Sequence, residues 1–455
     1  MTKEMAMTQK IRFARTLSFM PLIILFFFIT PLAILLNPEV IPRFLGKTSE
    51  ISQYGYLDVE HYLDIAENYD KEAWRTAFYP LWPKCLKLFN HFSPFDKYRT
   101  AIFVSSFLGM ISLLFGKYIF SQISKNKSSM SISWGLYVLS PMSIFLFNGY
   151  SESLFALESW ILIGLILNIL RTTNNNNASY QIKYSLILII CVALGLTRPS
   201  LVQATFSSII ALFLSLKAKQ SIHKIYVKEY LKISTMITFG FLIGYCIYGA
   251  ICMNDGFRFF EPFYAQQLWG KSFGIRPIYL LTARSELINF WGLYFPFILI
   301  VNSLSQVPIT GFKLNALNNV LFSNLPLTLT YPPAGIIYGL YSLRSKAKRM
   351  DKDVQSSNYL EKDYFNSLSF LFWYSSFFAF SHSLICFLTS ELYLASLARF
   401  IFGQPYFYVS LSILINSDLY KGIQRPKTVY ILTILLSSLM LLKNIIDFGN
   451  AKLHV

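Results

Sequence analysis

The side chains best suited to proton transfer lie in one stretch, residues 54–83, which is acidic in a chain that is otherwise mostly apolar. Its ionisable groups are Asp58, Glu60, His61, Asp64, Glu67, Asp70 and Glu72. Asp58, His61 and Ile65 have the i, i+3, i+7 spacing that places side chains on one face of a helix. A carboxylate and an imidazole one turn apart form an acid–base pair. A solvated amphipathic helix, with Asp58 as its N-cap, has the same spacing, so both interpretations stay open.

Two arginines at the ends of apolar runs are candidates for binding a phosphate. Arg198 follows residues 184–197 in a Thr-Arg-Pro turn, and Arg399 precedes residues 400–416. The planar guanidinium can bind two phosphate oxygens at once. The alternative for each arginine is extension toward lipid headgroups at the edge of a membrane.

Further binding candidates lie beside the apolar runs. Glu152 and its neighbour Tyr150 border residues 153–170, where an unpaired carboxylate is costly to bury in a membrane. Glu152 therefore belongs either to a substrate site or to an ion pair, for example with Arg198. Gln267 and Trp269 form a weaker set of candidates. Tyr79 and Trp82 fit anchors at the membrane interface better than platforms for a sugar ring.

Composition indicates a polytopic membrane protein. The chain has 455 residues, of which 54% are hydrophobic and only 14% charged, against about 25% charged in soluble domains. Its formal net charge of +17 fits the positive-inside rule and contact with anionic headgroups. Nucleic acid is not an expected partner, because the basic residues cluster between apolar runs.

Neither cysteines nor nucleotide motifs indicate a cofactor. Four of the five cysteines lie inside apolar runs, and no spacing implies a disulfide framework or a metal site. The sequence contains no P-loop and no dinucleotide fingerprint. We therefore expect no cofactor; a divalent ion between Asp58 and Glu152 is allowed by the chemistry but not required.

The apolar runs predict an all-α bundle of 11–13 transmembrane helices, forming a single domain over residues 1–455. The expected spans are 17–36, 100–121, 131–147, 153–170, 184–197, 200–216, 233–252, 365–389, 400–416 and 428–448. Residues 286–343 add an odd number of crossings, through a re-entrant segment or a break at Tyr331-Pro332-Pro333. The basic stretch 217–232 is expected in the cytoplasm, which places loops 37–99 and 253–285 outside.

Three segments resemble, in order, the PIG-V family of mannosyltransferases. LDVEHYLDIA (57–66) with AFYPLWP (77–83) resembles the family's first luminal loop, NGYSESLFAL (148–157) a second motif, and LARFIFGQPYF (397–407) a late Arg-aromatic segment. The family has Trp where this chain has Leu57, and a different turn where it has Thr197–Leu201. These departures favour a prokaryotic relative over a eukaryotic enzyme of glycosylphosphatidylinositol synthesis.

The resemblance implies a GT-C type glycosyltransferase, specifically a mannosyltransferase. Such an enzyme transfers a sugar from a polyprenyl or dolichyl phosphate to a lipid-linked or glycan acceptor on the outer or luminal side. It supports Asp58 as the base. His61, one turn later, is the candidate for assisting Asp58 or contacting the acceptor, and the first outer loop is expected to be helical. The expected partners are the donor, the acceptor and membrane lipids, in the plasma membrane of a prokaryote or the endoplasmic reticulum membrane of a eukaryote.

Two other classes of protein remain as alternatives. A transporter or lipid flippase would suit intramembrane charges and broken helices, although the sequence has no visible inverted repeat. A structural subunit of a larger membrane assembly would show no dependence on Asp58.

The first prediction concerns topology. We expect Glu60→Cys, with the native cysteines replaced, to react with a membrane-impermeant reagent in intact cells, if the protein is in the plasma membrane. Lys228→Cys, in the basic stretch, should react only after permeabilisation. Labelling of position 60 that requires permeabilisation would reverse the orientation and remove Asp58 from the outer face.

Overall fold

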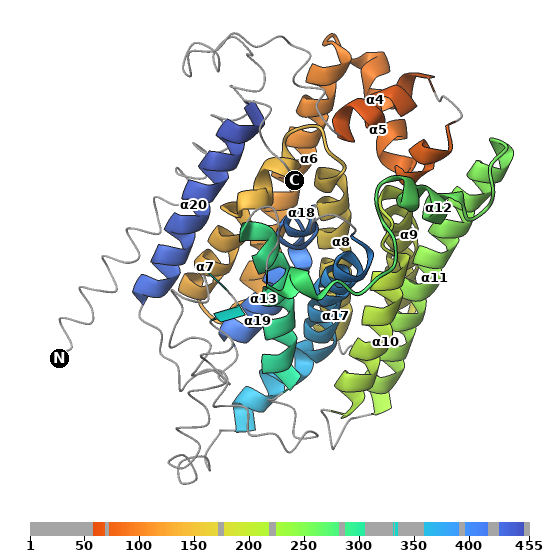
Figure 1. Cartoon of the computed structure of the whole chain (residues 1–455). Coiled ribbons are helices and arrows are strands. Elements are labelled where there is room, and N and C mark those ends of the chain that lie inside the picture. The colour runs from red at the N-terminus through yellow and green to blue at the C-terminus, as the bar shows by residue number, and fades with distance from the viewer. Residues whose placement is uncertain are drawn as a thin grey trace. The chain divides into compact units, whose positions relative to one another are not determined.

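The computed structural model describes residues 58–68, 72–171, 177–217, 224–281, 287–304, 331, 333–334, 359–390, 396–416 and 427–449. These residues are helical almost throughout (Figure 1). Within them there is no β-strand, only an isolated bridge between Lys271 and Ser390. The all-α prediction is confirmed for this part of the chain. The predicted span 17–36 and most of 305–343 lie outside it.

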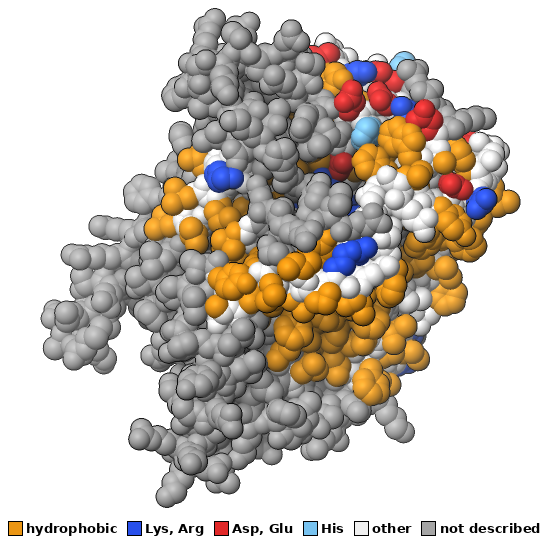
Figure 2. Space-filling model, in the orientation of Figure 1, with side chains coloured by type: hydrophobic (Ala, Val, Ile, Leu, Met, Phe, Trp, Pro, Cys, Tyr) orange, Lys and Arg blue, Asp and Glu red, His pale blue; other side chains and the backbone are white. Residues whose placement is uncertain are grey.

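Among the described residues, five helices are long and apolar enough to cross a membrane. They are α6 (Lys97–Ile123), α8 (Glu152–Arg171), α9 (Asn177–Thr197), α11 (Lys224–Asn254) and α17 (Tyr359–Thr389). Shorter apolar helices are α10 (Leu201–Lys217), α13 (Leu287–Leu304) and α20 (Lys427–Gly449). Hydrophobic side chains cover the exposed face over α10 and α11 (Figure 2), as a surface in contact with lipid requires. The larger count of 11–13 spans stays a prediction.

The chain forms two compact units. The described residues of unit 1 fall within Met1–Asp70, Trp82–Trp160 and Arg425–Leu453, and those of unit 2 within Lys71–Leu81 and Ile161–Gln424. Helix α8 begins in unit 1, which includes its residues up to Trp160.

Small residues on α6 let its neighbours in unit 1 approach closely. A Cβ at Gly109 would lie 2.3 Å from the carbonyl oxygen of Leu146, and one at Gly116 would lie 2.9 Å from the Trp160 ring. The helix packs on α7 (Lys127–Val138) and on the 3₁₀ helix η3 (Pro141–Leu146). The predicted continuous span 131–147 is therefore two short elements, because Pro141 has no N–H to continue α7.

Glycines also let α9 and α11 approach closely within unit 2. A Cβ at Gly240 would lie 2.4 Å from the Cβ of Cys191, and one at Gly244 would lie 2.7 Å from the backbone oxygen of Val192. Glycines four residues apart form the small-residue interface typical of helices that pack within membranes.

Helix breaks and short helices account for the remaining elements. The predicted span 400–416 is divided into α18 (Leu397–Phe402) and α19 (Pro405–Asn416), with Gly403 and Gln404 between them. Loop 253–285 contains α12 (Glu261–Leu268) and η4 (Pro277–Leu280). The described part of loop 37–99 contains α4 (Asp58–Asn68), η2 (Ala73–Ala77) and α5 (Leu81–Phe92), so the predicted helical character is confirmed for residues 58–68 and 72–99.

Candidate functional site

Helix α4 carries the proposed acid–base pair at the edge of its buried face. Val59, Tyr62 and Leu63 are buried, whereas Asp58 and His61 are half-buried. The predicted helical spacing is confirmed, and acidic side chains gather on the surface over α4 (Figure 2). Asp58 and His61 are thus held by a packed helix at the boundary between its buried and exposed faces.

A tight turn at Gly149 lies against α4, α5 and α6 within unit 1. The Gly149 N–H donates to the Ser105 hydroxyl at 2.8 Å, and its carbonyl accepts from the Trp82 indole at 3.0 Å. Gly149 has φ +89°, and a Cβ there would lie 3.1 Å from a methyl group of Val59. Only glycine fits this turn without strain.

A side-chain hydrogen bond joins α4 to Ser151, the residue that precedes α8. The Tyr62 and Ser151 hydroxyls lie 3.0 Å apart and are buried, although 89 positions separate them in the sequence. The Ser106 hydroxyl also donates to the Phe147 carbonyl at 3.1 Å. The structure thus brings two predicted motifs together, the acidic stretch and the segment that begins at Asn148.

The turn leads directly into Glu152, the first residue of α8. Glu152 is fully buried, and the positive end of the helix dipole stabilises a carboxylate at this position. Tyr150 is also fully buried, with its ring edge-on to Phe145 at 5.0 Å. Both residues are therefore fixed in place by the same turn.

Sequence reasoning missed Asn148. Its side chain is 1% exposed, and neither its amide nitrogen nor its amide oxygen has a hydrogen-bond partner among the described residues. A buried amide without partners is costly unless something binds it. Its sequence signal, Asn before Gly, indicates a turn, whereas burial became visible only in the structure. The amide can donate to one hydroxyl oxygen and accept from another hydroxyl.

Tyr79 and Trp82 are not exposed interface anchors, which corrects the prediction. Trp82 is fully buried beside Gly149 in unit 1. Tyr79 is buried in unit 2, where its ring lies 4.8 Å from that of Tyr248. Burial raises the pKa of the Tyr79 phenol above its ordinary value, with smaller effects from Tyr245 and Cys252. Neither ring has an open face for a sugar, so both stabilise the fold.

Unit 2 holds the two candidate arginines on one aromatic ring. The guanidinium carbons of Arg198 and Arg399 lie 4.6 Å and 5.2 Å from the centre of the Phe400 ring. Arg399 is only 6% exposed, and Arg198 is half-buried. Cation–π attraction favours each position.

Helix α13 positions the short helix that carries Arg399. The Asn289 side-chain oxygen accepts from the Ala398 N–H at 2.9 Å. A Cβ at Gly292 would lie 3.1 Å from Leu397, so the two elements are in close contact. Beyond the end of α18, the Gln404 amide is buried and has no hydrogen-bond partner in the described part of the chain. The Gln404 amide is a neutral hydrogen-bonding group between α18 and α19.

The weaker pair of candidates, Gln267 and Trp269, lies at the end of α12 in unit 2. Trp269 contacts the rings of Trp74 and Phe78 at 5.7 Å and 5.3 Å, and its indole donates to the Trp74 carbonyl at 3.1 Å. Trp269 therefore joins α12 to η2. Gln267 is exposed.

Neither a metal cluster nor a known relative adds to this description. In the residues that the structure describes, no group of three or more His, Cys, Asp or Glu side chains is arranged to hold a metal ion. A scan against protein-family models finds no matching family, and a search of curated proteins finds no matching relative. The fold by itself defines a class: a helical protein whose long apolar helices indicate a membrane protein.

We predict that Gly149→Ala destabilises the protein more than Gly256→Ala. Both glycines have φ +89°, so both variants incur the backbone cost of a left-handed residue, about 1–2 kcal/mol. A Cβ at Gly256 has nothing within 4 Å, whereas one at Gly149 also meets Val59 and Ala101. Thermal denaturation in detergent, followed by size-exclusion chromatography, measures the difference. Equal losses would mean that packing does not fix the turn.

Proposed function

We propose that the chain is a GT-C type membrane glycosyltransferase that transfers a sugar, mannose by resemblance, from a polyprenyl or dolichyl phosphate. The observation that carries the proposal is the packing of α4 against the turn at Gly149. It joins the half-buried Asp58 helix to the buried Asn148–Glu152 segment, and these are two of the segments on which the family resemblance rests. The acceptor is a lipid-linked or glycan hydroxyl on the outer or luminal side.

The reaction requires one proton acceptor near the attacking hydroxyl. The bond between the acceptor oxygen and the anomeric carbon forms as the bond from that carbon to the phosphate oxygen breaks. In this proposal Asp58 takes the hydroxyl proton, and His61, one turn later, contacts the acceptor. Asn148 is the further candidate for binding the acceptor, because its buried amide has both a donor and an acceptor group to offer.

The leaving lipid phosphate develops negative charge, which cations stabilise. Arg198 and Arg399 provide a site of this chemistry within unit 2, held on the Phe400 ring. Burial of Arg399 strengthens its interaction with an anion, because water screens the charge less. We assign the pair to donor phosphate, in preference to contact with headgroups alone.

Asp58→Asn should lower sugar transfer about 100- to 10,000-fold, the usual cost of losing a general base. The amide keeps the shape of the side chain but does not take up the proton. If Asp58 only caps α4, the variant should be nearly unaffected, because Asn caps as well as Asp. The assay follows tritium-labelled mannose from polyprenyl-phosphate mannose into acceptors of a lipid extract, using purified protein.

Asp64→Asn is the matched control, because Asp64 is also half-buried on α4. It should retain wild-type transfer at normal yield. Wild-type transfer by Asp58→Asn would remove Asp58 from the reaction. A transporter would move the labelled lipid across the membrane of vesicles that contain wild-type protein, without any covalent transfer of the sugar. That result would reject the glycosyltransferase proposal.

Arg399→Lys should weaken donor binding, because an ammonium group cannot reproduce bidentate contact with a phosphate. One lost charged hydrogen bond corresponds to about a 10- to 100-fold rise in KM for the donor. Arg258→Lys is the control: Arg258 also lies over an aromatic ring, that of Tyr264 at 5.6 Å, but is exposed. An unchanged KM in Arg399→Lys would leave Arg399 as a headgroup anchor.

A further inference from the structure

Helix α5 has three distinct faces. At 100° per residue, its protein-facing side is formed by the buried residues Trp82, Pro83 and Leu86. A second face is apolar and exposed, and consists of Leu88, Phe89 and Phe92. The third face is basic and exposed, and consists of Lys84, Lys87 and His91. Phe92 is 74% exposed, which is unusual for a large aromatic side chain in water.

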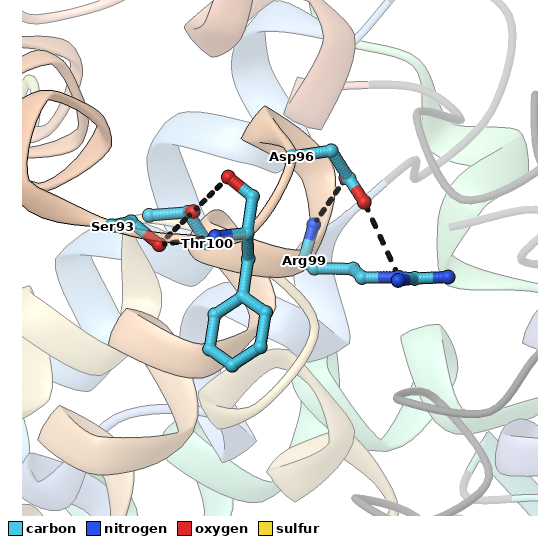
Figure 3. Close-up of polar contacts among 5 residues, drawn as sticks. Ser93, Asp96, Arg99 and Thr100 are labelled. Carbon is cyan, nitrogen blue, oxygen red and sulfur yellow. Dashed lines mark hydrogen bonds and ion pairs between the residues drawn. The ribbon is translucent and has the colours of Figure 1, made fainter.

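The turn after α5 is fixed to α6 by side-chain hydrogen bonds (Figure 3). The Ser93 hydroxyl accepts from the Phe95 N–H at 3.1 Å and from the Thr100 hydroxyl at 2.7 Å. Asp96 caps α6 by accepting from the Arg99 N–H at 2.9 Å. These bonds hold Phe95 at the start of α6, and its ring lies 6.1 Å from that of Phe103.

From Phe95 an exposed apolar stripe continues along α6. Its members recur every three or four residues after Phe103 and are Phe107, Met110 and Leu114. Because α6 is long and apolar enough to cross a membrane, this stripe is the one that lipid would cover. The exposed apolar face of α5 thus leads, through Phe95, into the lipid-facing side of α6.

We propose that α5 is an interfacial helix that docks on an anionic lipid surface. Leu88, Phe89 and Phe92 insert at the boundary of headgroups and acyl chains, and Lys84 and Lys87 bind lipid phosphates. Helices with one apolar and one basic face lie in the membrane plane in this way. A second copy of the chain fits the face less well, because it would bring like-charged lysines together.

Trp82 connects α5 to the interior of unit 1. The indole on the protein-facing side of the helix donates to the Gly149 carbonyl at 3.0 Å. A bilayer that holds α5 therefore also fixes the depth of the turn at Gly149. The inference stands whether or not the protein transfers a sugar, because it uses only exposure, charge and continuity with α6.

Spin labels on the full-length protein in lipid nanodiscs test the proposal. We attach a nitroxide to Leu88→Cys, Phe92→Cys or Lys84→Cys, in a Cys246→Ser background because Cys246 is exposed. Burial, with a smaller effect of Glu158, raises the pKa of the Cys85 thiol to about 11, so Cys85 reacts slowly at neutral pH. Protein without an introduced cysteine gives the residual signal to subtract.

Relaxation by oxygen, which concentrates in lipid, is compared with relaxation by a water-soluble nickel complex. In discs of phosphatidylcholine with phosphatidylglycerol, oxygen should dominate at positions 88 and 92 and nickel at position 84. Equal nickel access at positions 92 and 84 would overturn the proposal. Dipolar broadening between labels at position 92, in discs that contain two copies, would assign the face to a second chain and overturn it as well.

A separate experiment tests how much the charges of Lys84 and Lys87 contribute to lipid binding by α5. Each lysine near an anionic surface strengthens association about fivefold. Lys84→Gln with Lys87→Gln should therefore raise nickel access at position 92 in anionic discs, toward its value in discs of phosphatidylcholine alone. Lys125→Gln with Lys127→Gln, which removes the same charge beyond the other end of α6, should not change it. An equal effect of both pairs would reject lipid binding by Lys84 and Lys87.

Discussion

The packing of unit 1 depends on the two backbone hydrogen bonds of Gly149. The Gly149 N–H and carbonyl lie between packed helices, where an unpaired backbone group costs several kcal/mol because no water reaches it. Ser105 and Trp82 satisfy these two groups, and the positive φ of Gly149 directs the chain into α8. These two hydrogen bonds hold the turn against α5 and α6, and the separate bond between Tyr62 and Ser151 holds α4 beside it.

In unit 2 the corresponding polar groups are charged side chains, and not backbone groups as in unit 1. Arg399 is nearly buried, and its guanidinium and that of Arg198 lie on the Phe400 ring. The Asn289 side chain accepts a hydrogen bond from the Ala398 N–H and so fixes α18, the helix that contains Arg399. Cation–π attraction to the Phe400 ring favours both positions.

The two units thus provide complementary chemistry, each on its own packed helices. Unit 1 holds carboxylates and, at Asn148, a buried amide without a hydrogen-bond partner among the described residues, and unit 2 holds two guanidinium groups on one ring. The proposed sugar transfer assigns the proton acceptor to the first set of groups and the contact with phosphate to the second. The three-faced helix α5 adds a means of setting the depth of unit 1 in a lipid surface.

The sequence by itself determined the helices, because hydropathy and periodicity are local properties. It predicted both ends of α8, α10 and α20 to within one residue, and it placed Asp58 and His61 on one helix. It missed the breaks at Pro141 and Gly403, although a helix-breaking residue is present at each. Only the tertiary structure decided that Trp82 and Asn148 are buried, because burial depends on contacts between distant segments. Trp82 meets Gly149 across 67 positions, and no local pattern in the chain encodes that distance.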